Sequence, residues 1–477
     1  MFTTTFLGHQ GWMFQSERAA VLVDPLLCED FGAIHALDYR VWPPRQFTPE
    51  AFPRLDALVL SHEHDDHFDI PSLARLDRAI PVYLSARSSS AARDILRAMG
   101  FAVHALDPGM PVRLGDLEVV PFTGDHVSVN CGDEWDALPF LVRHVDGHGN
   151  MFSMVDITMT QGHVEWAAAR AMRPGLVSWT NNALDWSHMG EYMRERVEGT
   201  QQCFVKMGVG HKLITTVWGT PQAMITCAGG FAFAGDKAWL NQRVFCVDTE
   251  QVCAMMTNLY KKEKFFAGVP GQSWTLKAGK LAKVEPATPW LAAAPRADWP
   301  SRAKAAGELR DYAPATRREL GPGELDRLRA ALDELAGTLM GGAVFRGLCS
   351  LLVSECGDRR PTFAFVVRDG EARRGFEYVA SECRFVEAAP DPERGYVAGL
   401  ECWAADLLAV LDGALGPIAL TFGRARAWNA LAGRLSFEIF SDLHRHNHPL
   451  RRPAAYYKTY ERAWEQSRAT EPVIRAR

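Results

Sequence analysis

Six consecutive residues, His62 to His67, read HEHDDH and directly follow the apolar run LDALVL. Imidazoles and carboxylates are seldom packed this densely beside a buried strand unless they bind something, because each loses solvation on burial. The apolar run predicts a buried strand, and the six residues predict the loop that leaves its end. This loop is the feature that most constrains the chain.

The spacing within the loop indicates metal binding. His62 and His64 are two positions apart, so an extended loop points both imidazoles the same way. These two side chains can hold one divalent ion, and Asp66 with His67 can hold a second. The competing interpretation is a solvated polar loop that binds no metal.

The H-x-H-x-D-H pattern resembles the metallo-β-lactamase superfamily. The opening FLGHQGWMFQSERAAVLVDPLL is similar to that family's first hairpin, where Gly-His precedes two strands and Asp-Pro ends the second. The resemblance extends to about Met255 and implies two further metal ligands. These are His126, in EVVPFTGDHVSVN, and a bridging carboxylate at Asp156, in GNMFSMVDITMT. A turn or helix-capping role stays open for both residues.

The family's last histidine ligand has no counterpart. The matching segment, PQAMITCAGGFAFAGDKAWLN, keeps the glycines and the phenylalanine but offers Cys227-Ala228-Gly229 where the histidine would stand. His188 is the first candidate to complete the second metal site, and His211 is the second. A purely structural role stays open for each. By the same resemblance, His9 either lines the cavity or forms a structural hydrogen bond.

The resemblance implies an α/β fold, an αββα sandwich with a smaller C-terminal α+β domain. We expect the sandwich to be a catalytic domain and the Pro, Ala and Arg-rich stretch after it to be a linker or strap. A segment farther on, YVAGLECWAADLLAVLDGALGPIALTFG, resembles the end of a sterol-carrier-like domain, although an ordinary core is the simpler interpretation. The expected parts are residues 1–285 (catalytic domain), 286–320 (linker), 321–435 (α+β domain) and 436–477 (C-terminal tail).

Two reactions are open. The late segment resembles the metallo-β-lactamase-fold part of the CMP-N-acetylneuraminate hydroxylase family, which implies a di-iron monooxygenase using O2, with a possible electron-donor protein. A Rieske cluster is excluded, because no Cys-x-His or Cys-x-x-His spacing occurs. The alternative is a zinc or manganese hydrolase of an ester, lactone, amide or phosphodiester, in which a metal-bound hydroxide attacks. We expect Asp66, Asp156 and His188 to be catalytic; a non-catalytic, metal-stabilised scaffold is the third interpretation.

The amino-acid composition limits the kinds of molecule that this chain is expected to bind. The chain has 477 residues and a formal net charge of −5, so no basic surface calls for nucleic acid. No apolar run is long enough for a membrane span, and the N-terminus lacks the pattern of a signal peptide. Ten scattered cysteines favour reduced thiols in the cytoplasm. We expect a small-molecule substrate and consider a homodimer. Tryptophans are expected around an aromatic-walled pocket: Trp12, Trp135, Trp179, Trp186 and Trp218.

Overall fold

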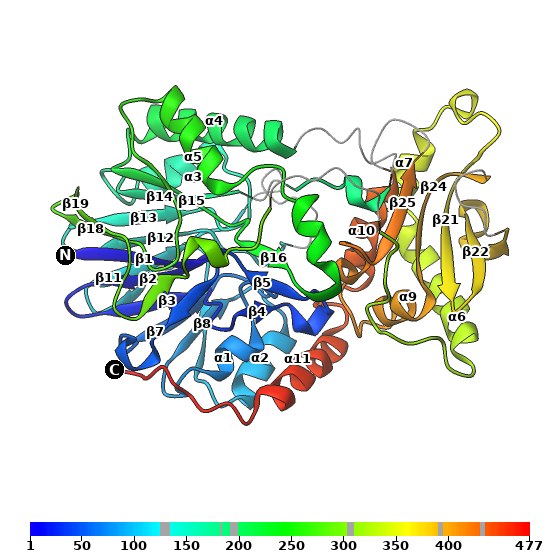
Figure 1. Ribbon diagram of the computed structural model, residues 1–477, viewed down its shortest axis with the longest axis horizontal. Helices are drawn as coiled ribbons and strands as arrows, with labels where there is room; N and C mark the ends of the chain where they lie inside the picture. Colours follow the sequence, from blue (N-terminus) through cyan, green and yellow to red (C-terminus); the bar gives the residue numbers. More distant parts are fainter. Residues whose placement is uncertain (125–133, 182–183, 191–198, 303–309, 390–394, 430–434) are drawn as a thin grey trace.

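The computed structural model describes the chain except for residues 125–133, 182–183, 191–198, 303–309, 390–394 and 430–434. Two β-sheets face each other at the N-terminal end of the molecule, and a third sheet with its own helices stands beside them (Figure 1). Within the described residues, no helix is both long and apolar enough to cross a bilayer.

The first sheet of the sandwich has eight strands among the described residues. Its antiparallel half is built on the first hairpin, and its other half is parallel, because β3, β7, β8 and β9 run the same way. In spatial order the strands are β19 (Lys280–Glu285), β18 (Ser273–Lys277), β1 (Phe2–Gly8), β2 (Gly11–Gln15), β3 (Ala20–Val23), β7 (Ala57–Leu60), β8 (Val82–Ser85) and β9 (Val103–Leu106).

The second sheet has seven strands among the described residues and is likewise half antiparallel and half parallel. Its order is β10 (Val112–Leu114), β11 (Leu117–Pro121), β12 (Phe140–His144), β13 (Asn150–Ser153), β14 (Leu176–Thr180), β15 (Ala223–Cys227) and β17 (Phe265–Ala267). The inner faces of both sheets supply one apolar core, which includes Phe14, Trp274, Phe140 and Ile225.

Helices cover the outer faces. On the first sheet lie α1 (Ile70–Ala74), α2 (Ser90–Ala98) and α11 (Pro453–Ser467), whose buried side chains share a cluster with that sheet. On the second sheet lie α3 (Gln161–Ala168), α4 (Gly199–Val217) and α5 (Thr249–Leu259). This arrangement confirms the predicted αββα sandwich.

Short strands extend the sandwich at one edge. One three-stranded sheet is formed by β4 (Asp30–Phe31), β5 (Tyr39–Val41) and β16 (Phe231–Phe233), and a two-stranded sheet by β6 (Arg45–Phe47) and β20 (Leu291–Ala293). The stretch expected to be a linker thus contributes a strand, and its Trp290 and Arg302 are buried.

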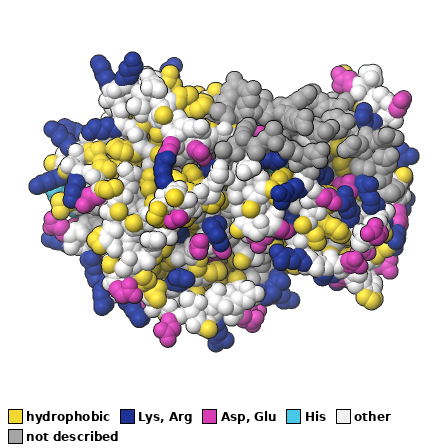
Figure 2. All heavy atoms as spheres, viewed as in Figure 1, with side chains coloured by type: hydrophobic (Ala, Val, Ile, Leu, Met, Phe, Trp, Pro, Cys, Tyr) yellow, Lys and Arg dark blue, Asp and Glu magenta, His cyan; other side chains and the backbone are white. Residues whose placement is uncertain are grey.

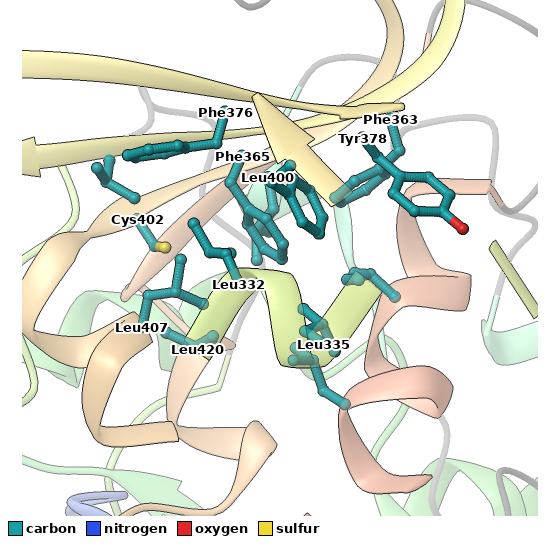
Figure 3. Close-up of a cluster of buried hydrophobic side chains, with 14 of the residues drawn as sticks. Leu332, Leu335, Phe363, Phe365, Phe376, Tyr378, Leu400, Cys402, Leu407 and Leu420 are labelled. Carbon is teal, nitrogen blue, oxygen red and sulfur yellow. The ribbon is translucent and has the colours of Figure 1, made fainter. Parts of the chain in front are cut away.

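The C-terminal layer is a five-stranded sheet with helices packed on one face. Its strands, in spatial order, are β23 (Arg384–Ala388), β22 (Ala372–Val379), β21 (Arg360–Asp369), β24 (Tyr396–Trp403) and β25 (Ala425–Asn429). The helices are α6 (Glu324–Leu339), α7 (Ala343–Cys349), α9 (Ala404–Leu411) and α10 (Leu435–His446). Figure 3 shows their common core, where Phe365, Leu400 and Leu332 meet between sheet and helix.

The final segment crosses back from this layer to the sandwich. Helix α10 packs in the C-terminal layer, whereas α11 packs beside α1 and α2 at the bottom of the view (Figure 1). Isolated bridges then join Ile474 to Leu76 and Ala476 to Leu55. The residues expected to form a tail are therefore divided between the two parts; the three boundaries between the predicted parts stay predictions.

The visible surface carries both signs of charge. Figure 2 shows Lys and Arg side chains interspersed with Asp and Glu on the face drawn, together with scattered apolar side chains.

Candidate metal centre

The HEHDDH loop leaves the C-terminal end of a parallel strand. Strand β7 ends at Leu60, and α1 begins at Ile70, where the Asp69 carboxylate caps the helix by accepting from the Ser72 N–H at 2.9 Å. Parallel strands of both sheets end at this edge, and the carboxyl ends of such strands are where α/β folds build their sites. Asp24 follows β3, Asp156 follows β13, and Cys227 ends β15.

Two overlapping groups of side chains have the composition and spacing of metal sites. In one group, ligand atoms of His62, His67 and Asp156 lie within 4.8 Å of one another; in the other, those of His9, Asp66 and His67 do. The His64 ring lies against the first group, with its centroid 4.5 Å from that of His62. The structure thus brings together five of the predicted ligands and adds His9.

The buried atoms of this cluster fit divalent cations. His62 is fully buried, and its Nε2 has no hydrogen-bond partner among the described residues while lying 3.8 Å from Asp156 Oδ2. Burial, with His67 and His64 nearby, lowers the pKa of His62 well below its usual value, so its imidazole is neutral. A neutral imidazole beside a carboxylate is the form that binds a metal ion.

His67 stands among three carboxylates. Its Nδ1 donates to Asp24 Oδ2 at 2.9 Å, its Nε2 donates to Asp156 Oδ2 at 2.8 Å, and Asp66 Oδ1 lies 3.8 Å away. Burial lowers the pKa of His67, but the charges of Asp66, Asp24 and Asp156 outweigh burial and raise it well above its usual value. Three carboxylates this close together in a buried place repel one another, so the arrangement favours bound cations.

Asp24 supports the loop from behind. Besides holding His67 Nδ1, it accepts from the Ser61 N–H at 2.8 Å and from the Ser61 hydroxyl at 2.6 Å. A carboxylate on the far nitrogen of a ligating imidazole fixes the ring and makes it a better ligand, leaving Nε2 for the metal. This agrees with the expectation that Asp-Pro ends a strand at the site.

Asp156 has its two oxygens in different surroundings. Oδ1 accepts from Gln10 Nε2 at 3.1 Å, whereas Oδ2 faces both His62 and His67. Burial raises its pKa, but the charge and hydrogen bond of His67 outweigh burial and lower it, so the group is a carboxylate. Oδ2 is therefore the oxygen of Asp156 that would be available to a metal ion held beside these imidazoles.

Cys227 is tied to Asp156 through Gln10. Its thiol donates to Gln10 Oε1 at 3.3 Å, and the Gln10 amide also donates to the Thr180 hydroxyl at 2.9 Å. Burial, reinforced by the charge of Asp156, raises the pKa of Cys227 to about 12. The thiol therefore keeps its hydrogen and donates it to Gln10.

Asp66 is one of the partly exposed side chains in the cluster. Its side chain is 29% exposed, whereas His62 and His67 are fully buried and Asp156 is 6% exposed. His9 Nε2 donates to Asp66 Oδ2 at 2.7 Å, and this contact fixes the carboxylate. His64 is also partly exposed, so solvent reaches the cluster at Asp66 and His64.

Backbone strain gathers around the centre. His9, Asp24, Val155 and Ala228 all have positive φ angles, of 52°, 44°, 52° and 57°. Such conformations are costly for residues other than glycine, above all for β-branched valine, and they concentrate at functional sites. Each of the four directly precedes, follows or supplies a polar group of the centre.

Three more histidines were predicted as metal ligands or as candidates for that role. His126 lies outside the described residues. His188 is in neither ligand group: it stacks on Phe422 with ring centroids 5.4 Å apart, and its Nδ1 contacts the Asp185 carbonyl at 3.0 Å. His211, on α4, pairs with Glu263 at 2.6 Å. Ligand roles for His126 and His188 stay predictions.

The aromatic surroundings of the centre differ from those expected. Trp12 lies in the core between the sheets, and Trp179 and Trp218 lie beneath the helices of the second sheet. Phenylalanine rings from the short strands lie beside His9 instead. They belong to an aromatic cluster that extends from His9 to His188. The rings that form this cluster or pack against it are Phe31, Tyr39, Phe231, Phe233, Trp186 and Phe422. Trp186 was among the tryptophans expected near the site, and it packs against this cluster. No periodic pattern marked the other rings in the sequence, because they come from three separate segments.

Comparison with known proteins follows this geometry. Residues 20–215 match the model of the beta-lactamase superfamily domain. This stretch is therefore similar to beta-lactamase superfamily domains. The match covers the HEHDDH loop and Asp156, and it does not reach the C-terminal layer. The expected resemblance of that layer to sterol-carrier-like domains has no support.

Several solved structures are similar to part of this chain at low identity. An isothiocyanate hydrolase from Delia radicum gut bacteria is 15% identical, covering 58% of this chain and 100% of its own, with a TM-score of 0.38. A possible metal-dependent hydrolase from Veillonella parvula is 14% identical over 58% and 100%, with a TM-score of 0.40. CmlA, a diiron beta-hydroxylase from Streptomyces venezuelae, is 16% identical over 58% and 54%, with a TM-score of 0.38. Similarities at this level do not distinguish hydrolysis from hydroxylation.

Proposed function

We propose that this chain is a dinuclear metal enzyme, and that it is a di-iron monooxygenase acting on a small organic substrate. The observation that carries the proposal is the hydrogen bond from the Cys227 thiol to Gln10 Oε1 at 3.3 Å. Cys227 lies in the segment that resembles the one carrying the family's last histidine ligand, and the ligand groups found among the described residues consist of imidazoles and carboxylates. Iron accepts such a set, and a ligand fewer leaves room for O2.

The residues have separate parts in this scheme. His62, His64 and Asp156 would hold one ion, and Asp66, His67 and Asp156 the other, with His9 orienting Asp66. Bound iron would supply redox chemistry with O2. Hydroxylation of a C–H bond consumes O2, two electrons from an external donor and two protons, and it releases one water. The partly exposed Asp66 faces the side from which substrate arrives.

Hydrolysis is the second candidate, and the Asp66–His9 pair favours it. A carboxylate fixed at 2.7 Å by an imidazole and open to solvent is suited to orient a water molecule for attack. Zinc or manganese would then be the resident metal, and the substrate an ester, lactone, amide or phosphodiester.

Metal content and oxygen labelling separate the two candidates. We expect about two iron ions per chain in the protein as purified, with near-ultraviolet absorption, because nitrogen and oxygen ligands suit iron. Reduced, iron-loaded protein given candidate substrates under labelled O2 gas should place the label in the product. Colourless protein holding zinc, with label entering only from water, would establish the hydrolase.

A further inference from the structure

Two acids of the HEHDDH loop belong to neither ligand group. Glu63 and Asp65 alternate with the histidines, and both are buried, at 5% and 9% exposure. A buried carboxylate without partners is costly, so its contacts show what the loop is attached to. Both acids lead to segments near the C-terminal end of the chain.

Glu63 joins the loop to two helices. One oxygen accepts from the Ser89 N–H at 2.8 Å and the other from the Ser89 hydroxyl at 2.7 Å, at the N-terminus of α2. The second oxygen also accepts from the Tyr460 hydroxyl of α11 at 3.3 Å. Tyr460 is 1% exposed, and its ring packs 5.3 Å from that of Phe68, directly after the ligands.

Asp65 joins the loop to the C-terminal layer through His35. The His35 Nδ1 accepts from the Gly416 N–H at 2.9 Å, and its Nε2 lies 3.4 Å from Asp65 Oδ1. Because Nδ1 accepts, the hydrogen of a neutral ring is on Nε2, the nitrogen that lies near Asp65. Gly416 directly precedes the short helix η9 (Pro417–Leu420) of the C-terminal layer.

We propose that the C-terminal part of the chain is a positioning component of the metal centre. Tyr460 and Gly416 hold the side of the loop opposite the ligands, so metal retention depends on the docking of α11 and of the segment before η9. The inference rests on the proposed function only in that the loop binds divalent metal; it holds for either reaction. Tyr460 is a positioning residue, since it acts through Glu63.

The test compares two hydroxyl deletions on one helix in the metal-loaded full chain. Tyr460→Phe removes the contact with Glu63, whereas Tyr457→Phe removes a hydroxyl from a partly buried ring of α11. The readouts are the rate of metal release to excess chelator and the visible spectrum of the cobalt-substituted protein. We expect release roughly 3- to 10-fold faster in Tyr460→Phe, at the low end for residues behind metal ligands, with a changed spectrum. Tyr457→Phe should match the unmodified chain.

Glu63→Gln, alone and combined with Tyr460→Phe, shows whether loss of the Tyr460–Glu63 contact causes the faster metal release. If Tyr460 acts through Glu63, adding Tyr460→Phe to Glu63→Gln should change the release rate little further. His35→Gln, on the other arm, should also speed release. Equal release rates for Tyr460→Phe and the unmodified chain, or fully additive effects in the double variant, would overturn the inference alone. A chain that binds no divalent metal would overturn both this inference and the proposed function.

Discussion

At the scale of single residues, the centre depends on a side chain that binds no metal in our scheme. Gln10 accepts from Cys227 and donates to Asp156 and Thr180, so it connects the ends of strands in both sheets. This polar bridge keeps Asp156 Oδ1 occupied and turns Oδ2 toward the histidines. Removing the Gln10 side chain should therefore weaken metal binding more than it lowers the stability of the fold.

We predict that Gln10→Leu weakens metal binding by about 10- to 100-fold, the usual cost of losing a partner behind a ligand. The measurement is a competition titration of the loaded protein against a chelator of known affinity. Cys227→Ser is the matched control, because a serine hydroxyl can still donate to Gln10. If Cys227→Ser loses as much affinity as Gln10→Leu, the thiol is a ligand and our assignment of its role is wrong.

At the scale of elements, the glycines after β15 are explained by a close approach of two backbones. A Cβ on Gly230 would lie 2.8 Å from the Trp42 carbonyl oxygen and 3.0 Å from the His9 nitrogen. The Trp42 N–H donates to the Gly230 carbonyl at 2.7 Å, and the Ala228 N–H donates to the His9 carbonyl at 2.8 Å. The segment after β15 thus helps to hold His9 in place.

We predict that Gly230→Ala lowers the free energy of unfolding by about 1–3 kcal/mol, since the nearest neighbours of the new Cβ are backbone atoms that yield little. Thermal unfolding of the metal-loaded protein measures this. Gly208→Ala on α4 is the control: among the described residues, no atom outside the backbone of its own helix lies within 4 Å of its Cβ position. Alanine is favoured over glycine in a helix, so that change should raise stability by about 0.5–1 kcal/mol. If Gly230→Ala leaves the free energy of unfolding unchanged, the two backbones are not tightly packed at this position.

The same elements show what could be predicted from sequence. The HEHDDH loop was recognisable because its groups lie within six positions after one apolar run, and the sandwich followed from the family pattern. Gln10, His35 and Tyr460 could not be assigned, since each acts through a partner more than twenty-five positions away. Helix α11 was expected to be part of a tail, but its Tyr456, Tyr460 and Trp464 pack against His35, Phe68 and Arg78, which lie more than 350 positions away in the sequence.

At the scale of the whole molecule, the sandwich and the C-terminal layer meet around buried charges. Arg424, from the layer, pairs with Asp38 at 2.9 Å and with Asp236 at 3.3 Å. Lys237 lies beside them at 2% exposure; its ammonium donates to the Leu37 carbonyl and stands 5.5 Å from the Tyr39 ring centroid. Two cations thus share two acids at the junction, close to the aromatic cluster.

This junction should make stability depend on pH. Burial, with Arg424 nearby, lowers the pKa of Lys237 from 10.5 to about 7, although Asp38 and Asp236 oppose the shift. Below pH 7 both folded and unfolded chains carry the proton, and the full penalty of the buried charge applies. Between about pH 7 and 10.5 only the unfolded chain holds the proton, so the contribution of Lys237 to stability rises with pH.

We predict that Lys237→Met removes this rise. At 1.36 kcal/mol per unit of pKa, the change in the free energy of unfolding across this range is on the order of a few kcal/mol. Urea unfolding at pH 7, 8, 9 and 10 should give a difference between variant and unmodified chain that shrinks as pH increases, since only the unmodified chain gains stability. The lost contact with the Leu37 carbonyl adds an offset that does not change with pH. A difference that stays constant from pH 7 to 10 would show that the folded chain keeps Lys237 protonated, with Asp38 and Asp236 sufficient to hold both cations at the junction.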